Sequence, residues 1–123
     1  MIVNGVNGAA DSVTPGLPAV LLYHNDNPST TTSGFTVNID GGNYSAFIVE
    51  SQTNLNITTT GKALVMVGSN QLATAGMTPA GYPCTRAITT VSNNQIVFGY
   101  GFSSAQDANA CIPLNIWGVN LTL

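Results

Sequence analysis

The sequence predicts an all-β fold, either an antiparallel β-sandwich or a jelly-roll-like barrel of seven to eight strands with long loops. Apolar and polar residues alternate in several short segments, as at Phe35, Val37 and Ile39, which places the apolar side chains on one face of an extended strand. Turns rich in Gly and Asn separate these segments, and no segment has the apolar spacing of a helix of ordinary length. Hairpins in series are typical of sandwiches and small barrels.

The chain is expected to form an N-terminal arm or loop over residues 1–18 and a single β-sandwich domain over residues 19–123. The arm is rich in Gly, Asn, Ala and Pro, and Pro15 and Pro18 exclude a regular helix at its end. A chain of 123 residues is long enough to bury roughly two-thirds of its unfolded surface.

The first strands follow directly from the alternation. Residues 20–24 are expected to form a short buried strand, and the Ser/Thr-rich residues 29–33 a loop. Residues 35–40 and 44–50 carry the strongest hairpin signal, because the glycines of the turn Asp40-Gly41-Gly42-Asn43 accept positive φ. Two further hairpins are predicted, with strands and turns at residues 55–59, 60–62 and 63–67, and then at 87–91, 92–94 and 95–102.

Residues 68–86 separate the second and third predicted hairpins. They are rich in Gly, Ala, Pro and Thr, so they predict a surface loop with one helical turn near residues 70–75. Residues 103–110 predict another loop, with a helical turn at 104–108.

The last strand, residues 112–123, alternates in two halves that are out of step by one residue. A β-bulge around Ile116, Trp117 and Gly118 would bring both halves to one face. This arrangement predicts that Trp117, the only Trp, closes the core.

Charged residues are scarce. They make up 6% of the chain, with Lys62 and Arg86 as the only cations, where about 25% is ordinary for a soluble domain. Such a surface lacks the charge repulsion that keeps many monomers apart, so the composition favours a protein partly covered by identical or different neighbours. A free extracellular domain with a Thr/Asn-rich surface is the alternative. Two scattered cations argue against nucleic-acid binding. No apolar run approaches the roughly 20 residues that span a bilayer, so no membrane insertion is expected.

No catalytic or metal-binding pattern is evident. His24 and Asp26 could face the same side at a strand end, but the G-x-S-x-G turn of a nucleophilic serine is absent. One histidine and two distant cysteines lack the paired spacing of a zinc site. The segment Asn25-Asp26-Asn27 offers oxygens to calcium, although Asx turns account for it without an ion. We therefore expect no enzyme, no metal and no cofactor.

Cys84 and Cys111 leave two alternatives open. A disulfide between them would stabilise the fold by roughly 3.5 kcal/mol in the chain-entropy account. Two reduced thiols that behave as small apolar side chains are favoured, because no export signal accompanies them.

Exposed loop residues are the best candidates for binding. Tyr82 lies in Pro79-Ala80-Gly81-Tyr82-Pro83, whose Gly and Pro residues predict a loop that could contact a glycan or a neighbouring subunit. The candidate binding residues are Tyr82 and Pro83 in this loop and Leu17 and Pro18 at the end of the arm.

The uncharged Thr/Asn/Gly-rich β composition and the segment Asn109 to Val119 resemble small virion proteins of tailed phages. That segment is similar to the closing strand of head-decoration proteins and tail-fibre tips. The resemblance implies a trimer, a β-sandwich or jelly-roll fold and no catalysis. It carries over no functional residue, and the stem that precedes a fibre tip is not seen here.

These expectations give two functional hypotheses. The first is a capsid decoration or cement protein that binds the outer head surface through the major capsid protein or another virion protein. It would be assembled in the host cytoplasm and carried in the virion, with residues 1–18 as a strap. The alternative is a lectin-like tail-fibre tip that recognises a host surface glycan through loop aromatics such as Tyr82.

Overall fold

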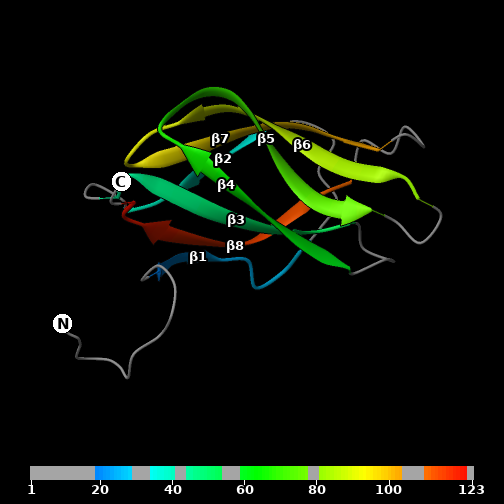
Figure 1. Cartoon of the computed structure of the whole chain (residues 1–123), viewed down its shortest axis with the longest axis horizontal. Coiled ribbons are helices and arrows are strands. Elements are labelled where there is room, and N and C mark those ends of the chain that lie inside the picture. Colours follow the sequence, from blue (N-terminus) through cyan, green and yellow to red (C-terminus); the bar gives the residue numbers. More distant parts are fainter. Residues whose placement is uncertain are drawn as a thin grey trace.

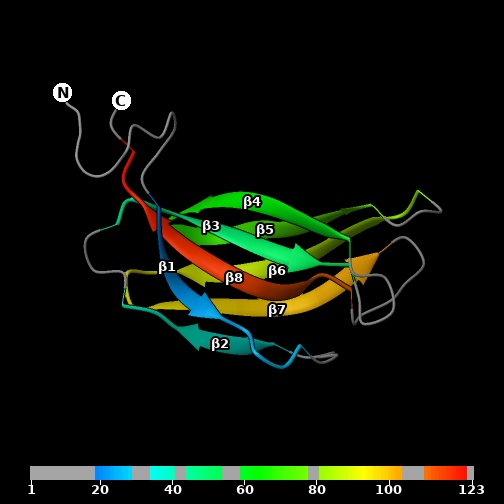
Figure 2. The same ribbon diagram turned by 90° about the horizontal axis from the view of Figure 1, so that it is seen from below.

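The computed structural model describes residues 19–28, 34–40, 44–53, 59–77, 81–103 and 110–121. In these ranges it consists of two four-stranded antiparallel sheets packed face to face (Figures 1 and 2). The eight strands are β1 (Ala19–His24), β2 (Phe35–Asn38), β3 (Ala46–Gln52), β4 (Thr60–Met66), β5 (Gly68–Met77), β6 (Pro83–Val91), β7 (Gln95–Ser103) and β8 (Ile112–Val119). The predicted all-β class is confirmed as a sandwich, and the sheets do not close into a barrel.

The strand order is β1-β8-β3-β4 in one sheet and β2-β7-β6-β5 in the other. The strand nearest the C-terminus, β8, lies between β1 and β3 and is hydrogen-bonded to both (Figure 2). It therefore joins β1 to the rest of its sheet.

The apolar core lies between the two sheets and takes side chains from both. Phe47 of β3 and Ile116 of β8 point inward from one sheet, and Ile96 and Phe98 of β7 point inward from the other. Phe35 of β2 stacks on Phe98 with the ring centroids 5.1 Å apart. Burying side chains of this size contributes about 1.5–3 kcal/mol each, so these residues are a main source of the stability.

One side of the sandwich is closed by the passage from β4 to β5, while β1 and β2 are the edge strands on the other side among the described strands (Figure 2). At the closed side the backbones approach so closely that a Cβ on Gly61 would lie 2.7 Å from the carbonyl carbon of Ala75. Only glycine fits this contact. The predicted turn at residues 60–62 is therefore wrong, because these residues begin β4.

The hairpins are confirmed in part. Strands β6 and β7 pair around residues 92–94 as predicted. Strands β2 and β3, which carry the strongest hairpin signal, instead lie in different sheets: β2 pairs with β7, and β3 pairs with β4 and β8. Alternation predicts a strand without naming the strand it pairs with.

The loop and helical turn predicted within residues 68–86 are wrong over residues 68–77 and 83–86, because these residues form β5 and the start of β6. Ala73 and Ala75 of β5 are buried, whereas the side chain of Leu72 on the same strand faces solvent and is 60% exposed. In most strands the large apolar side chains point inward, but in β5 the inward side chains are small and a large apolar one points outward. The sequence of β5 therefore lacks the alternation that predicts a strand.

The bulge predicted at Ile116, Trp117 and Gly118 is also wrong. The register of β8 against β3 shifts at Leu114 instead. Ile116 consequently points into the core, and Trp117 points outward and is half-buried. Gly118 faces inward, where a Cβ would lie 2.6 Å from the ring of Tyr44, so no larger side chain fits there.

Several expectations fall outside the described residues. They are the arm over residues 1–18 with the candidate binding residues Leu17 and Pro18, the loop at 29–33, the glycines of the first turn, most of the strand at 55–59, and the helical turn at 104–108.

Replacing Gly61 with Ala is expected to destabilise the fold by about 1–3 kcal/mol, the range for forcing extra atoms into a packed interior. The new methyl group would meet the backbone of β5. The exposed neighbour Thr60 provides the control, since Thr60→Val should change stability by less than about 0.5 kcal/mol. Urea unfolding followed by Trp117 fluorescence measures both, and equal unfolding midpoints would contradict the close approach.

Candidate functional site

The outward face of the β1-β8-β3-β4 sheet carries a row of apolar side chains that crosses all four strands. The strand registers place Leu21 opposite Trp117, and Trp117 opposite Ile48. Ile48 in turn lies opposite Leu64. Leu21 and Leu64, at the two ends, are 52% and 54% exposed, and the middle pair is half-buried. With strands about 4.8 Å apart, this apolar row is about 15 Å long.

A polar row lies beside the apolar row and also takes one residue from each strand. His24 Nδ1 and Asn115 Oδ1 are 2.6 Å apart, and Asn115 Nδ2 donates to Glu50 Oε1 at 2.9 Å. Lys62 Nζ lies 3.4 Å from Glu50 Oε2. Each member of the polar row has a partner within it. Polar side chains that are buried without hydrogen-bond partners destabilise a complex. Because these four side chains already pair with one another, another surface can cover this face without that cost.

His24 and Asp26 do face the same side, with His24 Nε2 3.4 Å from Asp26 Oδ1. No described serine, threonine or cysteine hydrogen-bonds to the His24 ring. The Asn27 N–H donates to Asn25 Oδ1 at 3.1 Å, which forms the expected Asx turn. Among the residues in the described ranges, no three His, Cys, Asp or Glu side chains lie together in a way that could hold a metal ion.

Arg86 of β6 lies in the core and is only 1% exposed. Its Nε donates to the Cys111 carbonyl at 2.8 Å, and Nη2 donates to the Ala110 carbonyl at 3.2 Å. Its Nη1 donates to the Gly99 carbonyl of β7 at 2.8 Å. The guanidinium carbon lies 5.5 Å from the ring centre of Phe35, within cation–π distance. One side chain therefore ties three strands of one sheet to the start of β8 in the other.

The sequence contains a signal for the burial of Arg86, although its charge alone suggests a surface residue. Cys84 and Ile88 lie two positions to either side, and both are buried. A strand that turns these two residues inward must also turn Arg86 inward. Desolvation in this position lowers the pKa of the Arg86 guanidinium. The hydrogen bonds to carbonyl oxygens favour its charged form.

Cys84 and Cys111 are both buried, and no disulfide joins them in the structure. Cys111 precedes β8 with a φ of 60°, in the left-handed region, and its N–H donates to the Thr53 carbonyl at 2.8 Å. Burial raises the pKa of the Cys111 thiol to about 11, although the Arg86 charge acts in the opposite direction.

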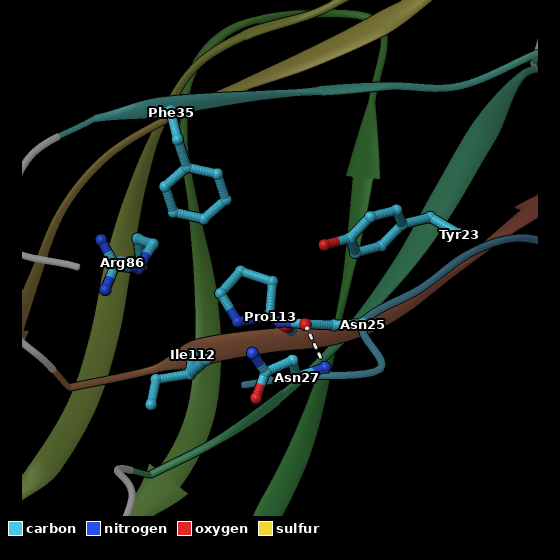
Figure 3. Close-up of a pocket in the computed structure, with 7 residues that line it drawn as sticks. All are labelled: Tyr23, Asn25, Asn27, Phe35, Arg86, Ile112 and Pro113. Carbon is cyan, nitrogen blue, oxygen red and sulfur yellow. Dashed lines mark hydrogen bonds between the residues drawn. The ribbon is translucent and has the colours of Figure 1, made fainter. Parts of the chain in front are cut away.

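A cavity of about 200 Å³ lies between the sheets where β1 ends and where β2 and β8 begin (Figure 3). Side chains from four strands and from the segment after β1 line it: Tyr23, Asn25, Asn27, Phe35, Arg86, Ile112 and Pro113. The cavity thus combines aromatic and aliphatic walls with amide, phenol and guanidinium groups, which is the usual composition of a small-molecule pocket.

The predicted loop residues lie elsewhere. Tyr82 is 43% exposed, and Pro83 is the exposed first residue of β6. Neither residue lines the cavity or belongs to the apolar row. The apolar row and the cavity were not identified from the sequence, because each combines residues that are far apart along the chain.

Comparison with known proteins finds no match to this chain among protein-family models, curated proteins or solved structures. Within the described ranges, no helix is long and apolar enough to cross a membrane. The structure defines the chain at the level of its class, an open β-sandwich with an apolar outer face and a cavity between its sheets.

Arg86→Met is expected to destabilise the fold by about 3 kcal/mol or more, because three backbone carbonyl groups, two buried and one part-buried, each lose a donor at about 1–3 kcal/mol. Lys62→Met is the matched control. It removes the other cation, which is exposed, and should change stability by at most about 1 kcal/mol. Guanidinium unfolding of both variants checks this, and a similar loss in the two would exclude a central role for Arg86.

The stability of the fold is expected to fall as the pH rises through the window from 9 to about 11. The thiol of Cys111 has an ordinary pKa of 9.0 when unfolded and a raised pKa of about 11 when folded. Below pH 9 the thiol is protonated in both states, so the full stability of the fold is retained. At higher pH the thiol of the unfolded state loses its proton first, which favours the unfolded state. The difference between the two pKa values corresponds to a loss of about 3 kcal/mol at most in the free energy of unfolding.

Cys111→Ala should show a shallower decline over the same pH window, measured as urea midpoints. Burial also raises the pKa of Tyr23, so part of the decline should remain in the variant. Parallel curves for the variant and the parent protein would show that the Cys111 thiol does not contribute.

Proposed function

We propose that this protein is a non-catalytic structural subunit that packs against neighbouring proteins through the outward face of its β1-β8-β3-β4 sheet. In its specific form it is a decoration or cement protein on the outer head surface of a tailed phage, where it stabilises contacts between capsomers. The observation that carries the proposal is the apolar row across all four strands of that sheet.

The apolar row has the properties of a contact surface. It is continuous from edge to edge of the sheet, and its two ends, Leu21 and Leu64, expose about half of their surface. Trp117 lies near the middle, and Trp is enriched among the residues that contribute most to binding energy at interfaces. Contiguous exposed apolar surface of this kind marks interaction sites on soluble proteins.

The polar row supports packing between copies of the chain. Glu50 and Lys62 neutralise each other, so two identical faces would not repel. Charged residues make up only 6% of the chain, which further reduces the repulsion between copies. The resemblance to phage virion proteins implies that the copies form a trimer on the capsid surface.

A second candidate function is a lectin-like, receptor-binding tip that recognises a host glycan. The exposure of Tyr82 next to Pro83 favours it, because an exposed aromatic ring can stack on a sugar. The apolar row favours assembly more strongly, since it spans four strands and includes four large side chains.

Leu64→Arg is expected to abolish self-association and binding to bare phage capsids, because it places an unpaired charge in the apolar row. Leu72→Arg is the matched control, since Leu72 is also an exposed leucine but lies on β5 of the other sheet. Gel filtration with light scattering measures the oligomeric state, and cosedimentation measures capsid binding.

Both variants should unfold at the same urea concentration as the parent protein, because both sites are exposed. A parent protein that stays monomeric at high concentration and does not bind capsids would contradict the proposal. Loss of assembly in Leu72→Arg, with assembly retained in Leu64→Arg, would move the interface to the opposite sheet.

A further inference from the structure

We infer that the cavity between the two sheets binds a single sugar ring, by contacts that are independent of the apolar row. The inference goes beyond structural assembly and gives the protein a small-molecule site. The site lies between the sheets, whereas the apolar row lies on an outer face. A subunit can therefore use both at once.

Polar groups without protein partners face the cavity. The hydroxyl of Tyr23 is directed into the space between Phe35 and Pro113 (Figure 3). In the described part of the chain this hydroxyl makes no hydrogen bond, and neither does the side-chain amide of Asn27. These groups provide one hydroxyl and one amide, which can donate to and accept from the hydroxyl groups of a sugar.

The apolar walls of the cavity suit the C–H groups on the face of a sugar ring. Phe35 and Pro113 border the same space into which the Tyr23 hydroxyl points, and Ile112 lies next to Pro113 (Figure 3). A ring that carries hydroxyl groups at its edge and C–H groups on its face meets both kinds of wall. The volume of about 200 Å³ is below the several hundred typical of drug-sized ligands, so it suits one ring rather than a chain of them.

The walls are held in place before any ligand binds. Phe35 stacks on Phe98, with the guanidinium of Arg86 5.5 Å from its ring centre. Asn25 donates from Nδ2 to the Pro113 carbonyl at 3.0 Å. A site whose side chains are already fixed loses little conformational entropy on binding, which favours affinity for a small ligand.

Arg86 contributes its position and charge to the inner wall, while at least three of its N–H groups are directed at backbone carbonyls. The Asn25 amide is likewise engaged by the Pro113 carbonyl and the Asn27 N–H. Recognition therefore depends on the phenol of Tyr23 and the side-chain amide of Asn27, and a carboxylate on the ligand is not required. The expected ligand class is a neutral pyranose, such as a hexose or an N-acetylhexosamine.

The test is an NMR titration of the ¹⁵N-labelled protein with a neutral hexose, an N-acetylhexosamine and a hexuronic acid, each up to high millimolar concentration. We expect at least one neutral sugar to shift the backbone amides of Tyr23, Asn25 and Asn27. Tyr23→Phe should weaken that binding by about threefold to tenfold, the effect of one hydrogen bond. Tyr100→Phe is the matched control, since Tyr100 is an exposed tyrosine that does not line the cavity.

Three results would overturn the inference: no shift at the cavity with any of the three sugars, binding of the hexuronic acid alone, or equal affinities in Tyr23→Phe and Tyr100→Phe. Shifts around Tyr82 alone would also overturn it and would favour the loop as a glycan site. The proposed assembly function fails separately. Tyr23→Phe should still associate, and Leu64→Arg should still bind the sugar.

Discussion

The buried guanidinium of Arg86 is the interaction on which the arrangement of the strands depends. A charge that is 1% exposed can be retained in a core only when its N–H groups are paired, and carbonyls from β7 and from the residues before β8 pair three of them. The Ala110 and Cys111 carbonyls must therefore face inward together. This requirement accounts for the left-handed backbone at Cys111, which β-branched or bulky residues would adopt only with strain.

The path of β8 determines the outer surface of its sheet. Once its start is held by Arg86 and its register shifts at Leu114, alternate residues are assigned to the two faces. Ile116 enters the core, and Trp117 and Asn115 face outward into the apolar and polar rows. The same strand also supplies Ile112 and Pro113 to the cavity. One buried cation thus acts on both candidate sites through the strand that it positions.

The sequence is sufficient for the strands in which polar and apolar residues alternate cleanly, as in β2, and for the hairpin of β6 and β7. It is insufficient where the contrast between the faces is reversed, as in β5, whose buried positions are Ala73 and Ala75. Sheet partners depend on contacts distant in the chain, which explains why β2 and β3 separate despite a strong turn signal. The outward position of Trp117 has a similar cause, because a tyrosine from another segment occupies the inward side at Gly118.

The described edge strands, β1 and β2, limit how copies could join in the proposed assembly. An exposed edge strand can template the addition of further strands, and a chain with so little charge has few residues to oppose it. Here the β2 edge is only four residues long, and the β1 edge is irregular, because its register shifts between Leu21 and Tyr23. Both features discourage open-ended fibre growth. The proposed assembly would therefore join copies by their faces, a geometry compatible with closed assemblies of defined size.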